Sequence, residues 1–270
     1  MNYTDAPDTS DLIEVGLTET QNFFILFFSS AVELSDVRWA GDTWNGVMFC
    51  LRCKDLIVGY GVHPVSSALS FEVEQGDYLC IVGENGAGKS TLVQTLLGLL
   101  PAISGTIEFG EGFEPSHIGY LPQQTALQKD FPAIVTEVVL SGFQNRIGWR
   151  PFYSRREKLV ARKNMVRLGI ESLAKKCYRQ LSGGQQQRTL LCRALCAGDR
   201  MLLLDEPTAS LDPQATESLY ELIRRLNREG MTIVMVTHDL FGARAEAKHF
   251  LRLGKTPCFG TADQLLRGGE

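Results

Sequence analysis

The residues with the clearest chemical signal form the run 83–90, which has the spacing G-x-x-x-x-G-K-S. Its members are Gly83, Glu84, Asn85, Gly86, Ala87, Gly88, Lys89 and Ser90, and Thr91 follows them. An apolar run at 78–82 and a helix-like run at 91–97 flank it, as a phosphate-binding loop requires. Gly86 and Gly88 allow backbone N–H groups to turn toward phosphate oxygens. Lys89 would neutralise the β- and γ-phosphates and Ser90 would ligate Mg²⁺, so the run predicts nucleotide binding.

A pair of carboxylates, Asp205 and Glu206, ends the apolar run that begins at Met201. Asp205 is suited to hold Mg²⁺, usually through water, and Glu206 to orient or deprotonate an attacking water. Two charges at the end of so apolar a strand are costly without a cation nearby. The pair therefore predicts a hydrolytic metal site.

A second anion site is indicated by the peptide Leu181-Ser182-Gly183-Gly184-Gln185, which precedes an apparent helix. Ser182 can cap that helix, and the N–H groups of the paired glycines lie at its positive end. A plain capped helix would explain Ser182 but not the two glycines. One chain thus carries two phosphate-binding helix starts.

Two single residues at predicted strand ends have weaker signals. Gln123 follows a strand at 118–121 and could reach a metal or a water at the γ-phosphate. His238 follows a strand at 232–237 and could hydrogen-bond the γ-phosphate. Taken alone, each is equally an ordinary strand-end residue.

The pattern of apolar residues predicts an α/β domain that positions these groups. Strands are expected at 51–58, 69–74, 78–82, 105–109, 118–121, 201–206 and 232–237, with the first two forming an antiparallel layer. Helices are expected at 91–97, 135–140, 157–168, 171–178, 186–191 and 213–229. Residues 126–185 have the character of a helical insertion into this core.

The bulk composition is that of an ordinary soluble globule, with 270 residues, 44% apolar and 21% charged. A formal charge of −4 gives no reason to expect nucleic-acid binding. Basic residues do cluster between Arg146 and Lys163, where a solvated helix face or a protein-docking surface is the favoured interpretation. Seven scattered cysteines suit reduced thiols, and the single C-x-x-C at Cys50 and Cys53 favours strand residues over a zinc or redox site.

Residues 1–47 differ from the rest, because no Lys or Arg occurs before Arg38 and an apolar run occupies 23–28. That run is too short to span a bilayer and lacks the positive flank of a secretory signal. We expect a poorly ordered extension at 1–47, with the working domain, 48–270, beginning near Met48.

In their order along the chain, these motifs resemble those of the ATP-binding cassette (ABC) family of nucleotide-binding subunits. The resemblance covers roughly residues 51–270. The resemblance implies a P-loop NTPase core, a RecA-like mixed sheet flanked by helices, with an antiparallel β layer and an inserted helical subdomain. It assigns Tyr60 to stacking on adenine, Gln123, Glu206 and His238 to catalysis, and Asp212 to the dimer interface. The implied cofactors are ATP and Mg²⁺. The Mg²⁺ ligands would be Ser90, Gln123 and Asp205.

The same resemblance implies a head-to-tail homodimer that traps two ATP molecules. The phosphate loop of one copy would face Ser182, Gly183, Gly184 and Gln185 of the other. A groove beside Gln123 and the helical insertion would receive a cytoplasmic helix of an integral membrane permease. The subunit would then lie on the cytoplasmic face of a bacterial cell membrane.

A finer resemblance is to the ATPases of bacterial zinc and manganese importers. It depends on residues 130–142, 181–195 and 257–261. It implies indirect cooperation with an extracytoplasmic metal-binding protein, and no cargo-metal site in this chain. Open alternatives are import of an iron–siderophore or a vitamin, and a soluble cassette ATPase such as the iron–sulfur assembly type. A switch-type GTPase is disfavoured because no N-K-x-D motif follows the phosphate loop.

Overall fold

The computed structural model describes residues 38–39, 48–123, 132–238 and 247–267. Its largest sheet has the strand order β12-β11-β6-β10-β9-β8. β12 is antiparallel to β11, and the other neighbours are parallel. The strands are β6 (Tyr78–Val82), β8 (Ile118–Leu121), β9 (Met201–Asp205), β10 (Thr232–Val236), β11 (His249–Arg252) and β12 (Cys258–Gly260). Since parallel strands end at one edge, the residues that follow β6, β8, β9 and β10 meet there.

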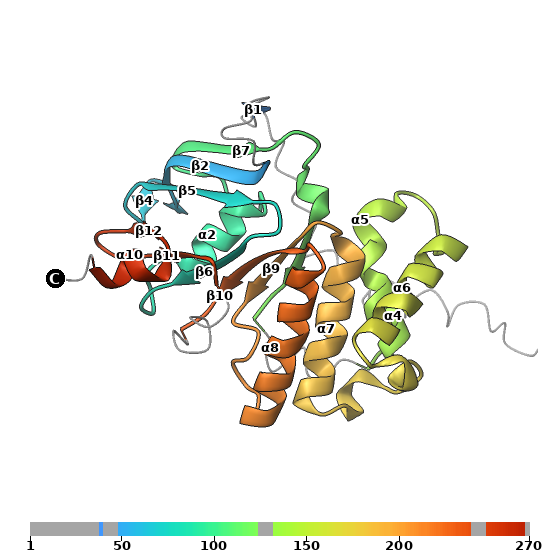
Figure 1. Ribbon diagram of the computed structural model, residues 1–270. Helices are drawn as coiled ribbons and strands as arrows, with labels where there is room; N and C mark the ends of the chain where they lie inside the picture. The colour runs from blue at the N-terminus through green and yellow to red at the C-terminus, as the bar shows by residue number, and fades with distance from the viewer. Residues whose placement is uncertain (1–37, 40–47, 124–131, 239–246, 268–270) are drawn as a thin grey trace, which may run out of the picture.

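Side chains alternate across this sheet and fill two separate cores. Leu79, Ile81 and Leu203 belong to one core, whereas Cys80 and Leu204 belong to the other. The central strands β6, β9 and β10 are buried on both faces, as expected for parallel strands covered on both sides. The covering layers are a second sheet with helix α2 (Lys89–Leu96) on one face and α7 (Gly183–Ala197) with α8 (Pro213–Arg228) on the other (Figure 1).

The second sheet has the order β1-β7-β2-β5 and is the expected antiparallel layer. Its strands are β1 (Arg38–Trp39), β2 (Phe49–Ile57), β5 (Leu69–Glu74) and β7 (Ser104–Phe109). A short hairpin of β3 (Gly59–Tyr60) and β4 (His63–Pro64) lies between β2 and β5 in the sequence. β1 comes from the segment for which poor order was expected, and it pairs in parallel with β7. The rest of that segment, 1–37 and 40–47, lies outside the described residues.

The helical subdomain packs against α7 on the side away from the antiparallel sheet (Figure 1). It contains α4 (Val135–Leu140), α5 (Gln144–Ile147) and α6 (Arg155–Arg167). Short 3₁₀ turns are η1 (Pro115–His117), η2 (Ser141–Phe143), η3 (Glu171–Leu173) and η4 (Tyr178–Gln180), and α10 (Ala262–Arg267) follows β12. Of the expected insertion 126–185, residues 126–131 lie outside the described part of the chain.

The predicted helix at 171–178 is wrong. Only the turn η3 and the first residue of the turn η4 form there, because backbone groups of the segment bond to residues at the start of α4 instead. Val135 N–H donates to the Lys176 carbonyl at 3.0 Å, and Tyr178 N–H donates to the Ala133 carbonyl at 2.8 Å. These long-range bonds give partners to backbone groups at the start of α4 that would have none within the helix. They also take up the backbone groups of 176 and 178 that i to i−4 bonds of a helix would need.

Helix α7 approaches β8 so closely that two glycines are required. A Cβ on Gly119 would lie 2.2 Å from the Ala194 carbonyl oxygen, and one on Gly198 would lie 2.0 Å from the Gly119 nitrogen. Real Cβ atoms do not approach backbone atoms this closely, so the helix would have to move. The close contact fixes α7 relative to the large sheet.

We expect Gly119→Ala to lower the free energy of unfolding by about 3 kcal/mol, the cost of overpacking a well-packed core. Chemical denaturation of the purified chain measures this change. Gly183→Ala is the matched control, because its Cβ would meet nothing closer than 3.5 Å. Equal stability of the two variants would show that α7 can move away from β8 without cost.

Candidate functional site

The phosphate loop lies between β6 and α2, as the sequence predicts. Gly86 and Gly88 have φ values of 84° and 91°, in the left-handed region that favours glycine. Gly88 is also the N-cap of α2, so the loop leads directly into the positive end of that helix. The curl and the helix end together form a site for an anion.

Lys89 is folded back over the loop that contains it. Its ammonium group donates to the carbonyl oxygens of Gly83 at 2.7 Å and Glu84 at 3.0 Å. Only 7% of the residue is exposed. The cation is thus held at the mouth of the curl, where it would meet phosphate oxygens.

Asp205 is a buried carboxylate at the carboxyl end of β9. Burial raises its pKa to about 6, and the charge of Glu206 acts in the same direction, whereas Lys89 opposes the shift. A carboxylate so poorly solvated gains from a bound cation. The residue therefore fits a Mg²⁺ ligand, and Ser90 lies in the first turn of the adjacent helix α2.

We expect Asp205→Asn to stabilise the chain in the absence of nucleotide and Mg²⁺. The folded-state pKa is raised above the ordinary 3.8, so this group weakens the fold as pH rises from about 4 to about 7. A shift from 3.8 to about 6 corresponds to about 3 kcal/mol. Chemical denaturation over this pH range should show the advantage of the variant growing to that size. The exposed Asp199→Asn control should show no such trend, and a constant difference would contradict the assignment.

Glu206 is the point on which the other candidate catalytic residues converge. Gln123 Nε2 donates to Glu206 Oε2 at 3.0 Å, and His238 Nδ1 lies 3.6 Å from Glu206 Oε1. Glu206 itself has a φ of 45°, uncommon for a residue with a side chain, and its N–H donates to the Val236 carbonyl at 3.0 Å. The structure thus brings together three residues that are far apart in the sequence.

Tyr60 lies beside the first turn of α2. The Thr91 hydroxyl donates to the Tyr60 oxygen at 3.4 Å, and 53% of the tyrosine is exposed. An exposed aromatic ring next to a phosphate loop has a free face on which a base could stack. Stacking on adenine stays a prediction.

The peptide predicted as a second anion site is a capped helix start in the structure, and its binding of an anion stays a prediction. Ser182 Oγ accepts from Gln185 N–H at 3.4 Å, and Gln185 Oε1 accepts from Ser182 N–H at 3.2 Å. Asp212 caps the neighbouring α8 by accepting from Ala215 N–H at 2.9 Å. The two helix starts are adjacent, since a Cβ on Gly184 would lie 3.1 Å from the Ala215 Cβ. Within the described residues, no hydrogen bond or ion pair joins Ser182 or Asp212 to the phosphate loop.

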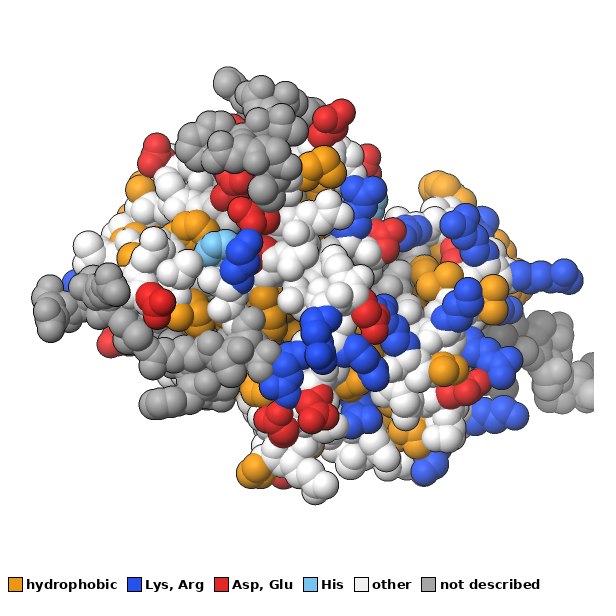
Figure 2. Space-filling model, in the orientation of Figure 1, with side chains coloured by type: hydrophobic (Ala, Val, Ile, Leu, Met, Phe, Trp, Pro, Cys, Tyr) orange, Lys and Arg blue, Asp and Glu red, His pale blue; other side chains and the backbone are white. Residues whose placement is uncertain are grey.

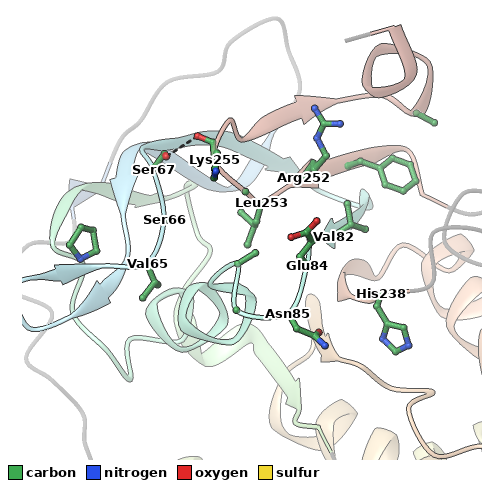
Figure 3. A pocket seen from close by; sticks show the side chains of 17 residues that line it. Val65, Ser66, Ser67, Val82, Glu84, Asn85, His238, Arg252, Leu253 and Lys255 are labelled. Atoms are coloured by element: carbon green, nitrogen blue, oxygen red, sulfur yellow. Dashed lines mark hydrogen bonds between the residues drawn. The ribbon is translucent and has the colours of Figure 1, made fainter. Parts of the chain in front are cut away.

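A pocket of about 1390 Å³ opens beside the phosphate loop, and its lining includes residues that the sequence did not single out. Figure 3 shows Glu84 and Asn85 of the loop with His238 on one side and Arg252 and Lys255 on the other. Val65 and Ser66, which follow the β3–β4 hairpin, line it too. In the sequence, the only feature that could have pointed to Val65 and Ser66 as pocket residues is their position after Tyr60. No sequence feature points to Arg252 and Lys255, because only the folding of the chain brings them to the loop.

Comparison with known proteins adds an independent line of evidence. The model of the family described as "ABC transporter" matches residues 66–209. The manganese transport system ATP-binding protein MntB of Bacillus subtilis is 38% identical over 196 residues, which cover 72% of this chain and 78% of that protein. The zinc transport system ATP-binding protein TroB of Treponema pallidum is 36% identical, with 73% of this chain and 75% of that protein covered.

Solved structures agree with these relatives. A metal-chelate type ABC transporter in an inward-facing conformation superimposes with a TM-score of 0.72 and 32% identity, over 80% of this chain and 84% of that chain. The cbiO1 protein of Clostridium perfringens, part of the ABC transporter complex cbiONQ, gives a TM-score of 0.69 and 26% identity, over 82% of this chain and 92% of that chain.

Proposed function

The chain belongs to the ABC transporter family and is an ATPase, and from this premise we propose that it energises uptake of a divalent metal ion, zinc or manganese, through a separate permease. The cargo is argued from relatives named as manganese and zinc transport ATP-binding proteins. No helix in the described part of the chain has the length and apolar character needed to cross a bilayer. The relatives are named as ATP-binding proteins of transport systems, and on that ground we assign the transport path to another chain, an integral membrane permease, which an extracytoplasmic binding protein would supply with metal.

The observation that carries the ATPase chemistry is the convergence of Gln123 and His238 on Glu206. Glu206 would accept a proton from the attacking water, and Gln123 would hold that water in place. His238 would hydrogen-bond the γ-phosphate. Tyr60 would stack on adenine. Backbone N–H groups of the loop and the Lys89 ammonium would bind the phosphate oxygens.

Ser90, Gln123 and Asp205 are the residues that would hold Mg²⁺, and the burial of Asp205 fits that role. When bound, the ion neutralises charge on the β- and γ-phosphate oxygens. Protons would compete with the ion for the Asp205 carboxylate, whose pKa is about 6, so binding of the ion should weaken as the pH falls below that value.

We propose a head-to-tail homodimer because one chain contains two separate predicted anion sites. The peptide 182–185 of a second copy would complete the phosphate site, and Asp212 would lie at the interface. Each chain then contributes half of two sites, and ATP joins the copies until it is hydrolysed. Such a subunit would work at the cytoplasmic face of the membrane, with the groove beside Gln123 receiving a permease helix.

Cellular metal content tests the cargo. Metal-limited cells carrying Glu206→Gln should contain less zinc or manganese than wild-type cells, with iron unchanged. The matched control is Glu221→Gln, an exposed carboxylate of α8. Unchanged content of all three metals, with ATPase activity intact in the purified wild type, would favour another cargo or a soluble cassette ATPase. Co-purification with a soluble scaffold instead of a membrane protein would favour the latter.

A further inference from the structure

A strongly basic segment lies at the outer side of the helical subdomain and has no part in the ATPase chemistry. Between residues 144 and 167 the chain has eight Lys and Arg side chains and one acidic side chain, although its total formal charge is −4. The basic residues are Arg146, Arg150, Arg155, Arg156, Lys158, Arg162, Lys163 and Arg167. Figure 2 shows Lys and Arg side chains mixed with hydrophobic ones on the right of the molecule, over α5 and α6.

Helix α6 presents an apolar row between two cationic rows. Residues seven apart lie on one stripe of a helix, and each residue is rotated by 100° from the one before. By this rule, the exposed side chains of α6 other than Lys158 fall into three neighbouring rows, and Lys158 lies beside the first of them. In order the rows are Arg155 with Arg162, Leu159 with Val166, and Arg156 with Lys163. Leu159 and Val166 are each 55% exposed, so the apolar row faces solvent.

Two aromatic side chains extend this surface in the loop before α6. Trp149 is fully exposed, and Phe152 is 79% exposed. Arg150 pairs with Glu157 at 2.8 Å, and Glu157 also accepts from Ser154 N–H at 2.6 Å. The single acidic side chain of the segment is thereby used to hold the loop against α6. We name the three rows together with Trp149 and Phe152 the α6 face.

Half of the cations of this segment remain available to a partner. Arg150 pairs with Glu157 as described, and Arg146 lies 3.9 Å from Asp199. Arg162 pairs with Glu171 at 2.8 Å, and Arg167 pairs with Glu229. No ion pair within the described ranges involves Arg155, Arg156, Lys158 or Lys163. Uncompensated like charges repel one another at short range, which an anionic partner would relieve.

We propose that the α6 face binds the anionic headgroup surface of a phospholipid bilayer. The cationic rows would contact lipid phosphates, while the apolar row and the two aromatic rings enter the boundary between headgroups and acyl chains. Tryptophan is enriched at that depth of a membrane. A nucleic acid would satisfy the cations but leave Leu159 and Val166 in water. The inference draws on the proposed function only in that a transporter subunit works beside a membrane.

Co-sedimentation of the purified full chain with vesicles tests the inference. Vesicles of phosphatidylglycerol mixed with phosphatidylcholine should bind the chain, and pure phosphatidylcholine should bind it at least about tenfold less. Raised salt should weaken the binding. The variant Arg156→Glu with Lys163→Glu should bind at least about tenfold less than wild type, while its ATPase activity is retained. The control Lys175→Glu with Arg228→Glu makes the same charge change at exposed cations outside the face and should bind as wild type does.

Fluorescence of Trp149 adds a direct readout. The chain has three tryptophans, so Trp39→Phe with Trp44→Phe leaves Trp149 as the single reporter. Its emission should shift to the blue on adding anionic vesicles. Equal binding to both vesicle types, an unshifted emission, or tighter binding to an RNA homopolymer than to anionic vesicles would each overturn the proposal. Neither permease nor cargo is present, so failure here is distinct from failure of the transport assay.

Discussion

Glu206→Gln is expected to lower kcat for ATP hydrolysis by about 10²- to 10⁴-fold, the contribution typical of a general base. The substitution keeps the shape of the side chain and the amide can still contact Gln123, which lies 3.0 Å away. It removes the oxygen that accepts the proton of the attacking water. Binding of ATP should persist, because Lys89 and the loop backbone are unchanged.

Two measurements on this variant separate chemistry from binding. Phosphate release gives kcat, and size exclusion with ATP and Mg²⁺ should show a stable dimer that the wild type forms only transiently. The Glu221→Gln control should keep wild-type turnover. A variant that turns over normally would remove Glu206 from catalysis, and one that stays monomeric with ATP and Mg²⁺ would contradict the trapped dimer.

Lys89→Ala is expected to weaken ATP binding by about 100-fold, the loss for a charge-assisted contact to phosphate of roughly 3 kcal/mol. The ammonium lies at the mouth of the loop curl, held by the carbonyl oxygens of Gly83 and Glu84. Alanine removes the cation that the γ-phosphate would meet. Here the affinity itself falls, in contrast to Glu206→Gln.

Calorimetric titration with ATP and Mg²⁺ measures the affinity of Lys89→Ala. Lys175→Ala, at an exposed position in the helical subdomain, is the matched control and should bind as wild type does. ATP affinity equal to that of the wild type would show that this loop is not the nucleotide site.

Four strands of the large sheet, β6, β8, β9 and β10, could be predicted from the sequence because each is a short apolar run. The other two, β11 and β12, are not predicted, because β11 begins and ends with a charged or polar residue and β12 has only three residues. β6, β9 and β10 fall within a residue of their expected ranges. The failure at 171–178 has a different physical origin. Amphipathic spacing favours a helix there, but hydrogen bonds to Ala133 and Val135, about forty residues away, determine the backbone instead. No local pattern contains that information.

The candidate site could be predicted where a single short peptide contains both the functional groups and the backbone turn that positions them. The phosphate loop and the Ser182 cap are such peptides, because spacing alone defines their geometry. The contacts of Glu206 with Gln123 and His238 come instead from strand order, which places β8, β9 and β10 side by side. The pocket residues Arg252 and Lys255 lacked even a motif.

The hydrogen bonds that Lys89 makes to its own loop bear on which ligands the loop can bind tightly. Two carbonyl oxygens of the loop, those of Gly83 and Glu84, accept hydrogen bonds from the ammonium group that a phosphate would contact. A ligand that binds here must replace these two hydrogen bonds with stronger ones to its own oxygens. A polyphosphate can do so because it carries several charged oxygens. Adenosine has no charge to offer, and a single phosphate offers only a few contacts. We therefore expect the affinity of the loop for a ligand to rise with the number of phosphates that the ligand carries, whatever its base.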